Sequence, residues 1–277
     1  MVNEEMEDLH GPRYITDASG KKILLIRKSM VEDYISCPWK FKRIWIDGVK
    51  KVPNQDMLVG TRYHDFMEKF FKKLLPIDYW DDMIPEGYYL PIEEDWIRWT
   101  IRMEKERYYD LVSKGRQDEF LPIKTEFKMV SPRLYLESTV DRAEWYDQEK
   151  GYVCLVEYKT GASENWQSVK RQLALYAILW EDVVKLGKVT HMKLVNPNSK
   201  TYKIINLDPW EKDHVYKTIG NIRKALKDGI YKHTCNEIIY AYCMLCTPGE
   251  TGMYPDDDGL TCVEYLEKRR AECLMTS

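Results

Sequence analysis

Two strand-like runs that are each followed by an acidic residue constrain this chain more than any other feature. The second run, residues 151–156, is rich in β-branched and aromatic side chains, and the pentapeptide Glu-Tyr-Lys-Thr-Gly at 157–161 follows it directly. Such a run, closed by Thr-Gly, is typical of a buried β-strand. Because side chains alternate between the faces of a strand, we expect Glu157 and Lys159 to point to the same side. Charges at the end of a buried strand are costly unless they stabilise each other or bind a metal ion.

The first run, 133–140, ends at Asp141. A turn near residues 147–151 would fold the two runs into a hairpin and bring Asp141 close to Glu157 and Lys159. An alternating segment at 123–130 precedes them, and we expect its Glu126 to supply a further carboxylate that supports Asp141. The sequence therefore predicts a cluster of carboxylates and one lysine on neighbouring strands.

Helical and strand patterns alternate along the rest of the chain, which indicates an α/β fold. A Ser29–Glu32 capping box predicts a helix from Met30, and Pro38 predicts the start of a second one. Further helices are expected at 60–71, opened by Gly60, and at 92–114, 168–180 and 208–228. Strands are expected at 22–26, 189–195 and 201–207, and residues 76–95 are expected to be rich in loops.

His64 lies in the first turns of the helix expected from Gly60. A lone helical histidine is more often a packed or surface group, but together with Asp141 and Glu157 it forms a donor set suited to Mg²⁺ or Mn²⁺. Such an ion neutralises a phosphate and lowers the pKa of a bound water. Lys159 would hold that water or stabilise charge on phosphorus. The alternative for Lys159 is a structural ion pair with Glu157 or Asp141.

Basic and acidic residues nearly balance, at 42 and 45, so any nucleic-acid contact has to depend on local basic clusters. No segment predicts a signal peptide or a membrane-spanning helix, which favours the cytoplasm, or the host cytoplasm for a viral protein. Seven cysteines in a reducing compartment indicate metal or cluster binding rather than disulfides. Cys243 and Cys246 form a C-x-x-C pair, which needs two further thiolates to bind zinc or an iron–sulfur cluster.

Six motifs, in this order, resemble the RecB-like branch of the PD-(D/E)XK nuclease superfamily, in particular its CRISPR-associated and viral iron–sulfur exonucleases. They are Cys37 in Ser-Cys-Pro, His64 in Gly-Thr-Arg-Tyr-His, Asp141, Glu157-Tyr158-Lys159, Gln172-x-x-x-Tyr176 and Cys243-x-x-Cys246. The resemblance implies a mixed central sheet flanked by helices, with a helical part stapled by a cysteine cluster. Ser138 stands where the family has a glycine before the aspartate, and its small side chain should be tolerated.

The resemblance also implies the roles of the site residues. The expected metal ligands are His64, Asp141, Glu157 and the backbone carbonyl of Tyr158, Lys159 is the expected catalytic lysine, and Gln172 and Tyr176 match a motif of exonucleases that act on DNA ends. The implied activity is a DNA exonuclease that prefers single-stranded ends, with proteins of recombination, viral or CRISPR-adaptation complexes as partners. A catalytically silent DNA-binding or scaffolding subunit and a cysteine-stapled structural module stay open as alternatives.

The cysteines of that family hold a [4Fe–4S] cluster, and Cys37, Cys243 and Cys246 match three of its ligands. The family's last cysteine falls near Gly252 in this chain, so Cys262 is the expected fourth ligand and Cys235 the alternative. Zinc in the same four thiolates, or no cluster at all, is the alternative to the iron–sulfur cluster.

For the organisation of the chain, we expect an N-terminal extension at 1–28 and a single nuclease domain at 29–277. Within it, residues 29–125 would be mainly helical, 126–230 would form the nuclease core, and 231–277 would carry the C-terminal cysteines.

Overall fold

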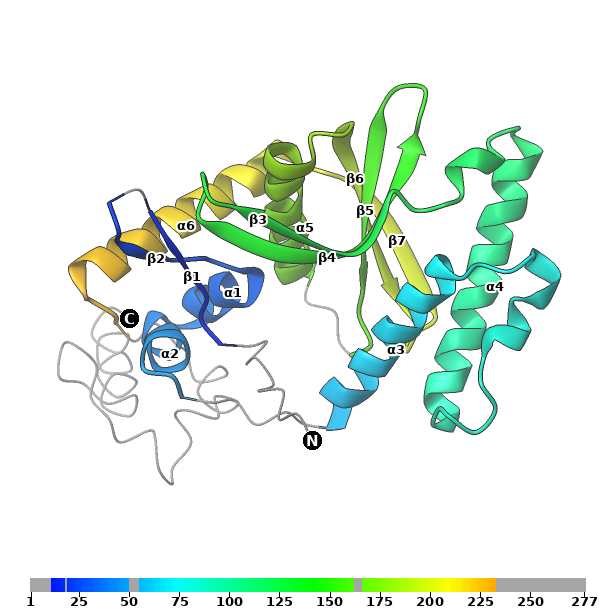
Figure 1. Cartoon of the computed structure of the whole chain (residues 1–277), viewed down its shortest axis with the longest axis horizontal. Helices are drawn as coiled ribbons and strands as arrows, with labels where there is room; N and C mark the ends of the chain where they lie inside the picture. Colours follow the sequence, from blue (N-terminus) through cyan, green and yellow to red (C-terminus); the bar gives the residue numbers. More distant parts are fainter. Residues whose placement is uncertain (1–10, 18, 50–54, 162–165, 233–277) are drawn as a thin grey trace, which may run out of the picture. The chain divides into compact units, whose positions relative to one another are not determined.

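A computed structural model of the chain describes residues 11–17, 19–49, 55–161 and 166–232. These residues divide into two compact units, one made of 11–49 with 215–232 and the other of 55–214 (Figure 1). Helix α6 (Pro209–Asp228) begins in the second unit and continues in the first.

The larger unit is built on a mixed five-stranded sheet with the strand order β3-β4-β5-β6-β7. The strands are β3 (Lys124–Ser131), β4 (Leu136–Asp147), β5 (Tyr152–Tyr158), β6 (Lys188–Asn196) and β7 (Thr201–Asn206). Neighbouring strands are antiparallel except β5 and β6, which are parallel because the chain passes through helix α5 (Trp166–Leu179) between them. The prediction of a mixed sheet with 151–156 as a buried strand is confirmed.

Helices cover both faces of this sheet (Figure 1). Helix α5 lies on one face, and α3 (Gln55–Lys72) and α4 (Pro91–Ser113) pack against the other. Alternation along β5 explains this division, because Val156 and Tyr158 join the aromatic-rich core formed with α3 and α4 while Glu157 lies on the opposite face. Burial of large side chains such as Trp80 and Phe70 in this core stabilises it by roughly 1.5–3 kcal/mol each.

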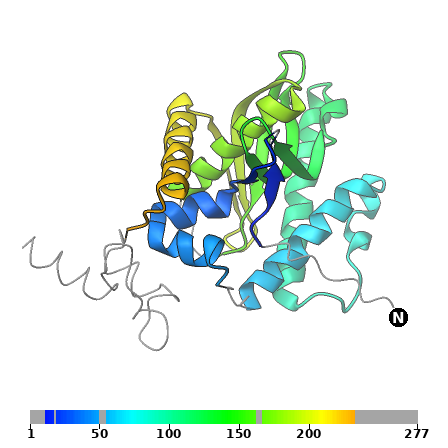
Figure 2. The same ribbon diagram turned by 60° about the vertical axis from the view of Figure 1, so that its left-hand side comes forward.

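The smaller unit combines a short hairpin with helices from both ends of its sequence. Its elements are β1 (Tyr14–Thr16), β2 (Lys22–Leu24), α1 (Lys28–Ser36), α2 (Pro38–Phe41), a π-helical turn η1 (Lys42–Ile46) and α6 from residue 215. The Tyr34 hydroxyl donates to the Asn221 carbonyl over 3.3 Å, and the Phe41 ring stacks on Tyr231 at 6.2 Å. These contacts hold α6 beside α1 and α2, as Figure 2 shows.

Short helical turns connect the longer elements. They are η2 (Ile77–Tyr79), η3 (Asp81–Met83), η4 (Gln117–Glu119) and the π-helical η5 (Trp180–Val184). The loop-rich character expected before α4 is confirmed, and α6 ends as predicted at Gly229, whose φ of 71° needs a glycine. Within the described residues no helix has both the length and the apolar composition required to cross a bilayer.

Some predicted boundaries are wrong. Helix α1 begins before Ser29, because the N–H groups of Met30 and Val31 already donate to the Arg27 carbonyl, and no side chain caps it. Helix α3 begins at Gln55, so that Gly60 lies inside it rather than at its start. Strand β4 starts only at Leu136 and continues past Asp141 to Asp147.

Candidate active site

Three side chains from three elements meet near the carboxyl end of β5 in the larger unit. His64 comes from α3, Glu126 from β3 and Asp141 from β4. The His64 Nδ1 atom lies 3.2 Å from Glu126 Oε1 and 3.7 Å from Asp141 Oδ1. One ligand atom from each residue lies within 4.8 Å of the other two, which is close enough for all three to bind one metal ion.

Packing and hydrogen bonds hold two of these groups in place. The edge of the His64 ring packs against the Tyr158 ring, with 5.9 Å between centroids. The second carboxylate oxygen of Asp141 accepts a hydrogen bond from the Tyr158 N–H at 2.8 Å. Asp141 is therefore tied to the end of β5 by one oxygen, while its other oxygen faces His64.

Glu126 has an unusual backbone conformation for a strand residue. Its φ is 41°, a left-handed value that is rare for any residue except glycine. The flanking residues pair normally with β4, Thr125 with Arg142 and Phe127 with Val140, so the distortion is confined to Glu126, opposite Asp141. Strain of this kind clusters at functional sites, where the surrounding structure enforces it. Here it accompanies the carboxylate that reaches His64.

The surrounding charges change the protonation of His64. Burial on its own lowers the pKa of His64, but Asp141, the hydrogen bond to Glu126 and the charge of Glu157 outweigh it and raise the pKa to about 9. The carboxylates thus create a strong local preference for positive charge. The same carboxylates would stabilise a bound divalent cation, which carries more positive charge than a protonated imidazole.

Lys159 lies at the centre of a hydrogen-bonded chain on the α5 side of the sheet. Its Nζ donates to Glu157 Oε1 at 2.5 Å and to Gln172 Oε1 at 3.1 Å. The amide of Gln172 donates in turn to the Tyr176 hydroxyl at 2.7 Å, and Tyr176 is also hydrogen-bonded to Ser138. Burial raises the pKa of Tyr176 well above its usual value, so this hydroxyl stays protonated. These hydrogen bonds fix the direction of the Lys159 ammonium.

The turn after Lys159 is anchored to β6 and approached closely by α3. The Lys159 N–H donates to the Val195 carbonyl at 2.9 Å, and the Asn196 side-chain amide donates to the Gly161 carbonyl at 3.1 Å. A methyl group at Gly60 would lie only 3.0 Å from the Thr160 hydroxyl oxygen. Gly60 therefore lets the helix that carries His64 pack directly against this turn. No sequence pattern predicted a function for Asn196 or Thr160.

A buried ionic network lies behind Asp141, on the other face of the sheet. Arg142 donates to Glu104 at 2.8 Å and lies 3.0 Å from Glu144. Arg107 is bonded to Glu104 at 2.7 Å, and Lys193 lies 4.0 Å from Glu144. This network joins α4 to β4 and β6 next to the residues that carry the site. It was not predicted, because charged residues in a sequence usually indicate a solvated face.

The structure groups the predicted ligands differently from the expected set. The residue that completes the cluster with His64 and Asp141 is Glu126, which was predicted only as a supporting carboxylate. Glu157 is bonded to Lys159 and lies near enough to raise the pKa of His64. The side chain of Tyr158 packs into the opposite core, and the role of its carbonyl stays a prediction.

Only one of the predicted cluster cysteines lies within the described residues. Cys37 is buried at the junction of α1 and α2 in the smaller unit. Cys235, Cys243, Cys246 and Cys262 lie outside the described residues. Cys154 is buried on β5, where burial raises the pKa of its thiol, in keeping with a packing role.

Comparison with known families identifies the superfamily of this chain. A model of the PD-(D/E)XK nuclease superfamily matches residues 28–247, most of the chain. The chain belongs to the PD-(D/E)XK nuclease superfamily. Among solved structures, a protein from Eubacterium rectale described as a "Putative exonuclease" is similar, with 10% identity, a TM-score of 0.48 and coverage of 75% of this chain and 84% of that chain. No curated protein matches the chain significantly.

The assignment of Asp141 and Glu157-Tyr158-Lys159 to the acidic and (D/E)XK positions of the superfamily motif stays a prediction. Hard carboxylate oxygens with one imidazole suit Mg²⁺ or Mn²⁺, the ions typical of these nucleases. The donor set of the structure therefore fits the metal that the superfamily implies.

Proposed function

We propose that this protein is a divalent-metal-dependent deoxyribonuclease, most active as an exonuclease on single-stranded or frayed DNA ends. The observation that supports it best is the convergence of His64, Glu126 and Asp141 beside a lysine held by Glu157 and Gln172. The superfamily supports nuclease chemistry, and the Gln172–Tyr176 pair resembles the motif of enzymes that act on DNA ends.

In this proposal His64, Asp141 and Glu157, with the Tyr158 carbonyl, hold Mg²⁺ or Mn²⁺, and Glu126 completes the set. The bound ion would neutralise the scissile phosphate and lower the pKa of a coordinated water. The buried carboxylates position these oxygens before substrate arrives, so little reorganisation is needed during the reaction.

Lys159 supplies the positive charge nearest to the reacting phosphate. Its ammonium donates one N–H to Glu157 and one to Gln172, and it has three in all. The third is directed to the attacking water or to a non-bridging phosphate oxygen. Gln172 and Tyr176 act on Lys159 by fixing its position, and are positioning residues in this scheme.

The test is digestion of 5′- and 3′-labelled single and double strands with Mg²⁺ or Mn²⁺. The wild-type protein is expected to degrade single strands from an end, and Lys159→Ala to lose at least about 100-fold in rate. Lys150→Ala, which removes an exposed ion pair with Asp147, is the matched control and should cut normally. Intact DNA with the wild-type protein, or equal rates for Lys159→Ala, would exclude the proposal.

The ion pair between Lys159 and Glu157 also supports a second candidate, a catalytically silent DNA-binding or scaffolding subunit. If the only role of Lys159 is to neutralise Glu157, the protein would fold normally and would not cleave DNA. DNA that is bound but never cleaved, at any metal concentration, would favour this candidate.

We further propose the RecB-like assignment with its [4Fe–4S] cluster on Cys37, Cys243, Cys246 and Cys262, with Cys235 as the alternative ligand. It is supported by the resemblance of the motifs and by the buried position of Cys37. Anaerobically purified protein should be brown and contain iron, whereas zinc without colour would indicate the zinc alternative. This cluster is compatible with one nuclease domain over 29–277 and with a reducing cytoplasm.

A further inference from the structure

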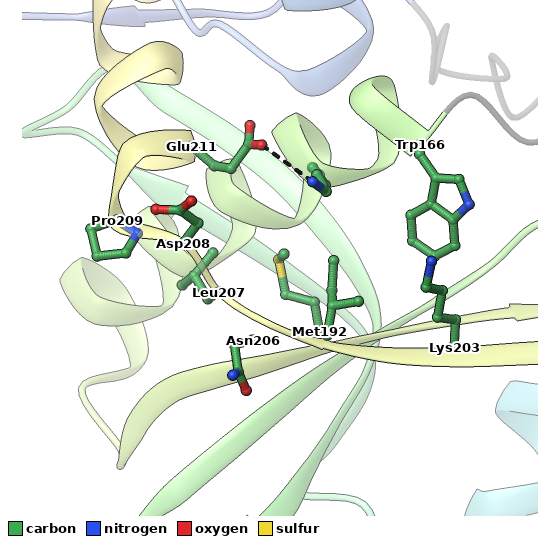
Figure 3. Close-up of a pocket in the computed structure, with 10 residues that line it drawn as sticks. Trp166, Met192, Lys203, Asn206, Leu207, Asp208, Pro209 and Glu211 are labelled. Carbon is green, nitrogen blue, oxygen red and sulfur yellow. Dashed lines mark ion pairs between the residues drawn. The ribbon is translucent and has the colours of Figure 1, made fainter.

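A hollow of the larger unit is lined by none of the candidate active-site residues and lies on the α5 face of the sheet at β6 and β7. Its volume is about 570 Å³, a size typical of small-molecule sites. Figure 3 shows how α5, the two strands and the start of α6 surround it. The residues that line it include Trp166, Lys170, Met192, Lys203, Leu207 and Glu211.

An aromatic ring and a cation form one wall of this hollow. The Lys203 ammonium lies 4.5 Å from the centre of the Trp166 ring. Figure 3 shows the two side chains next to each other. A smaller adjoining hollow of about 190 Å³ is lined by the same two residues. The Trp166–Lys203 pair therefore stands between two concave surfaces and is accessible from both.

The opposite wall is acidic and the floor is apolar. Glu211 is almost fully buried and lies 3.9 Å from the Lys170 ammonium. Asp208 accepts a hydrogen bond from the Trp210 N–H at 2.9 Å, which caps α6 and accounts for its position. Met192 and Leu207 provide apolar surface between the two walls.

We propose that this hollow binds an unpaired nucleobase of the DNA strand whose end is cut, an inference that rests on the proposed nuclease function. A flat base stacks on Trp166, as bases stack on aromatic side chains in proteins that bind single strands. Lys203 leaves the indole ring and contacts the adjacent phosphate. Glu211 accepts a hydrogen bond from an exocyclic amino group, which favours cytosine and adenine over thymine.

The chemistry of the walls favours this ligand over others. A free anion would be repelled by the carboxylates of Glu211 and Asp208. A purely apolar ligand would make no favourable contact with the charges of Lys203 and Glu211. A nucleotide has a flat ring that can stack on Trp166, an amino group that can donate to Glu211 and a phosphate that can contact Lys203. Strand β6 leads from Met192 in the hollow to Val195 beside the Lys159 turn, roughly 10 Å away, so one strand of DNA can reach both.

The experiment measures binding separately from cutting. All variants are made in the Lys159→Ala background, and the anisotropy of fluorescein-labelled single strands and of a blunt hairpin is followed at fixed salt. Trp166→Ala should weaken single-strand binding about ten-fold, and Trp166→Phe, which keeps an aromatic face, should weaken it less. Lys203→Ala should reduce the salt dependence by about one phosphate contact.

The matched control is Trp210→Ala, which removes an exposed tryptophan at the start of α6 that does not line the hollow. It should bind single strands like the background protein, and none of the variants should change binding to the hairpin. Unchanged single-strand affinity for correctly folded Trp166→Ala, or an equal loss for the hairpin, would overturn the inference. Such a result would leave the nuclease proposal standing, since that depends on cutting by the protein with Lys159 intact.

Discussion

Glu126 combines two properties that are rarely found together, a strained backbone and a carboxylate in contact with a histidine. A left-handed φ costs a non-glycine residue about 1–3 kcal/mol, so the sheet and α3 must enforce this conformation. If the strain serves the metal site, then replacing Glu126 with glycine should stabilise the metal-free fold and weaken metal binding at the same time.

We therefore predict that Glu126→Gln weakens Mn²⁺ binding about 10- to 100-fold, because one ligand or one partner of a ligand is lost. Glu126→Gly should weaken it equally while raising the stability of the metal-free protein by about 1 kcal/mol, since glycine tolerates this φ. Calorimetric titration with Mn²⁺ and chemical unfolding with chelator measure the two effects. Glu106→Gln, an exposed carboxylate on α4, is the control, and unchanged Mn²⁺ affinity in Glu126→Gln would exclude the role.

The raised pKa of His64 leads us to predict that metal binding depends on pH. Its pKa of about 9 means that the imidazole is protonated at neutral pH in the metal-free protein, and only the neutral ring can bind a metal. The apparent affinity for Mn²⁺ should therefore rise about ten-fold per pH unit between pH 6 and 8 and level off near 9. Titrations in buffers of different ionisation enthalpy measure the proton released. His64→Gln should bind more weakly and lose this dependence, whereas a flat profile in the wild-type protein would contradict the assignment.

At the scale of elements, the network of Arg142 joins α4 to the strands that carry the site. Burial on its own raises the pKa of Glu104, but Arg107 and Arg142 outweigh it and hold the pKa well below its usual range. The pKa of Glu144 is lowered by the same cations. A carboxylate whose folded pKa is depressed adds stability above its unfolded pKa, and that stability is lost as the pH falls.

The free energy of unfolding should therefore decrease as the pH falls below about 4.5, the ordinary pKa of glutamate. Glu104→Gln should cost about 3–5 kcal/mol at pH 7, because it leaves buried cations unpaired, and should show a shallower loss between pH 5 and 3. Urea unfolding at a series of pH values measures both. The control is Glu94→Gln on the same helix, whose exposed pair with Arg98 should be worth less than about 1 kcal/mol.

The elements also show what local sequence can predict. The apolar run of β5, the β6–β7 hairpin and the end of α6 at Gly229 follow from periodicity and turn residues, and the structure confirms them. Strand β4 continues past Asp141, where the predicted run ended, through Arg142 and Glu144, and their burial depends on Glu104, which α4 contributes from far away in sequence. The distortion at Glu126 depends on Asp141 and His64, which lie far away in sequence, so no local pattern could indicate it.

For the whole molecule, the candidate metal site and Cys37 belong to different compact units. His64, Glu126 and Asp141 belong to the unit of residues 55–214, while Cys37 belongs to the other. Cluster chemistry and metal binding should then be separable by mutation, because none of the three residues of the metal site lies in the unit of Cys37.

If Cys37 is a cluster ligand, Cys37→Ser should lose iron and visible absorbance and lower the melting temperature by several degrees, since several stabilising bonds disappear. Mn²⁺ affinity at the His64 site should change less than about two-fold. Iron analysis, calorimetric melting and Mn²⁺ titration test this together. A buried packing role for Cys37 predicts that Cys37→Ala keeps iron and melts close to the wild-type protein.

The close approach of Gly60 to Thr160 has a practical consequence for anyone who builds a library of variants. Alanine in the middle of a helix is ordinarily a safe replacement for glycine and adds about 0.5–1 kcal/mol of stability. At position 60 the added methyl group would lie only 3.0 Å from the hydroxyl oxygen of Thr160, the residue next to Lys159. A contact this tight offsets the usual gain, so position 60 is better left out of a library that replaces helical glycines with alanine.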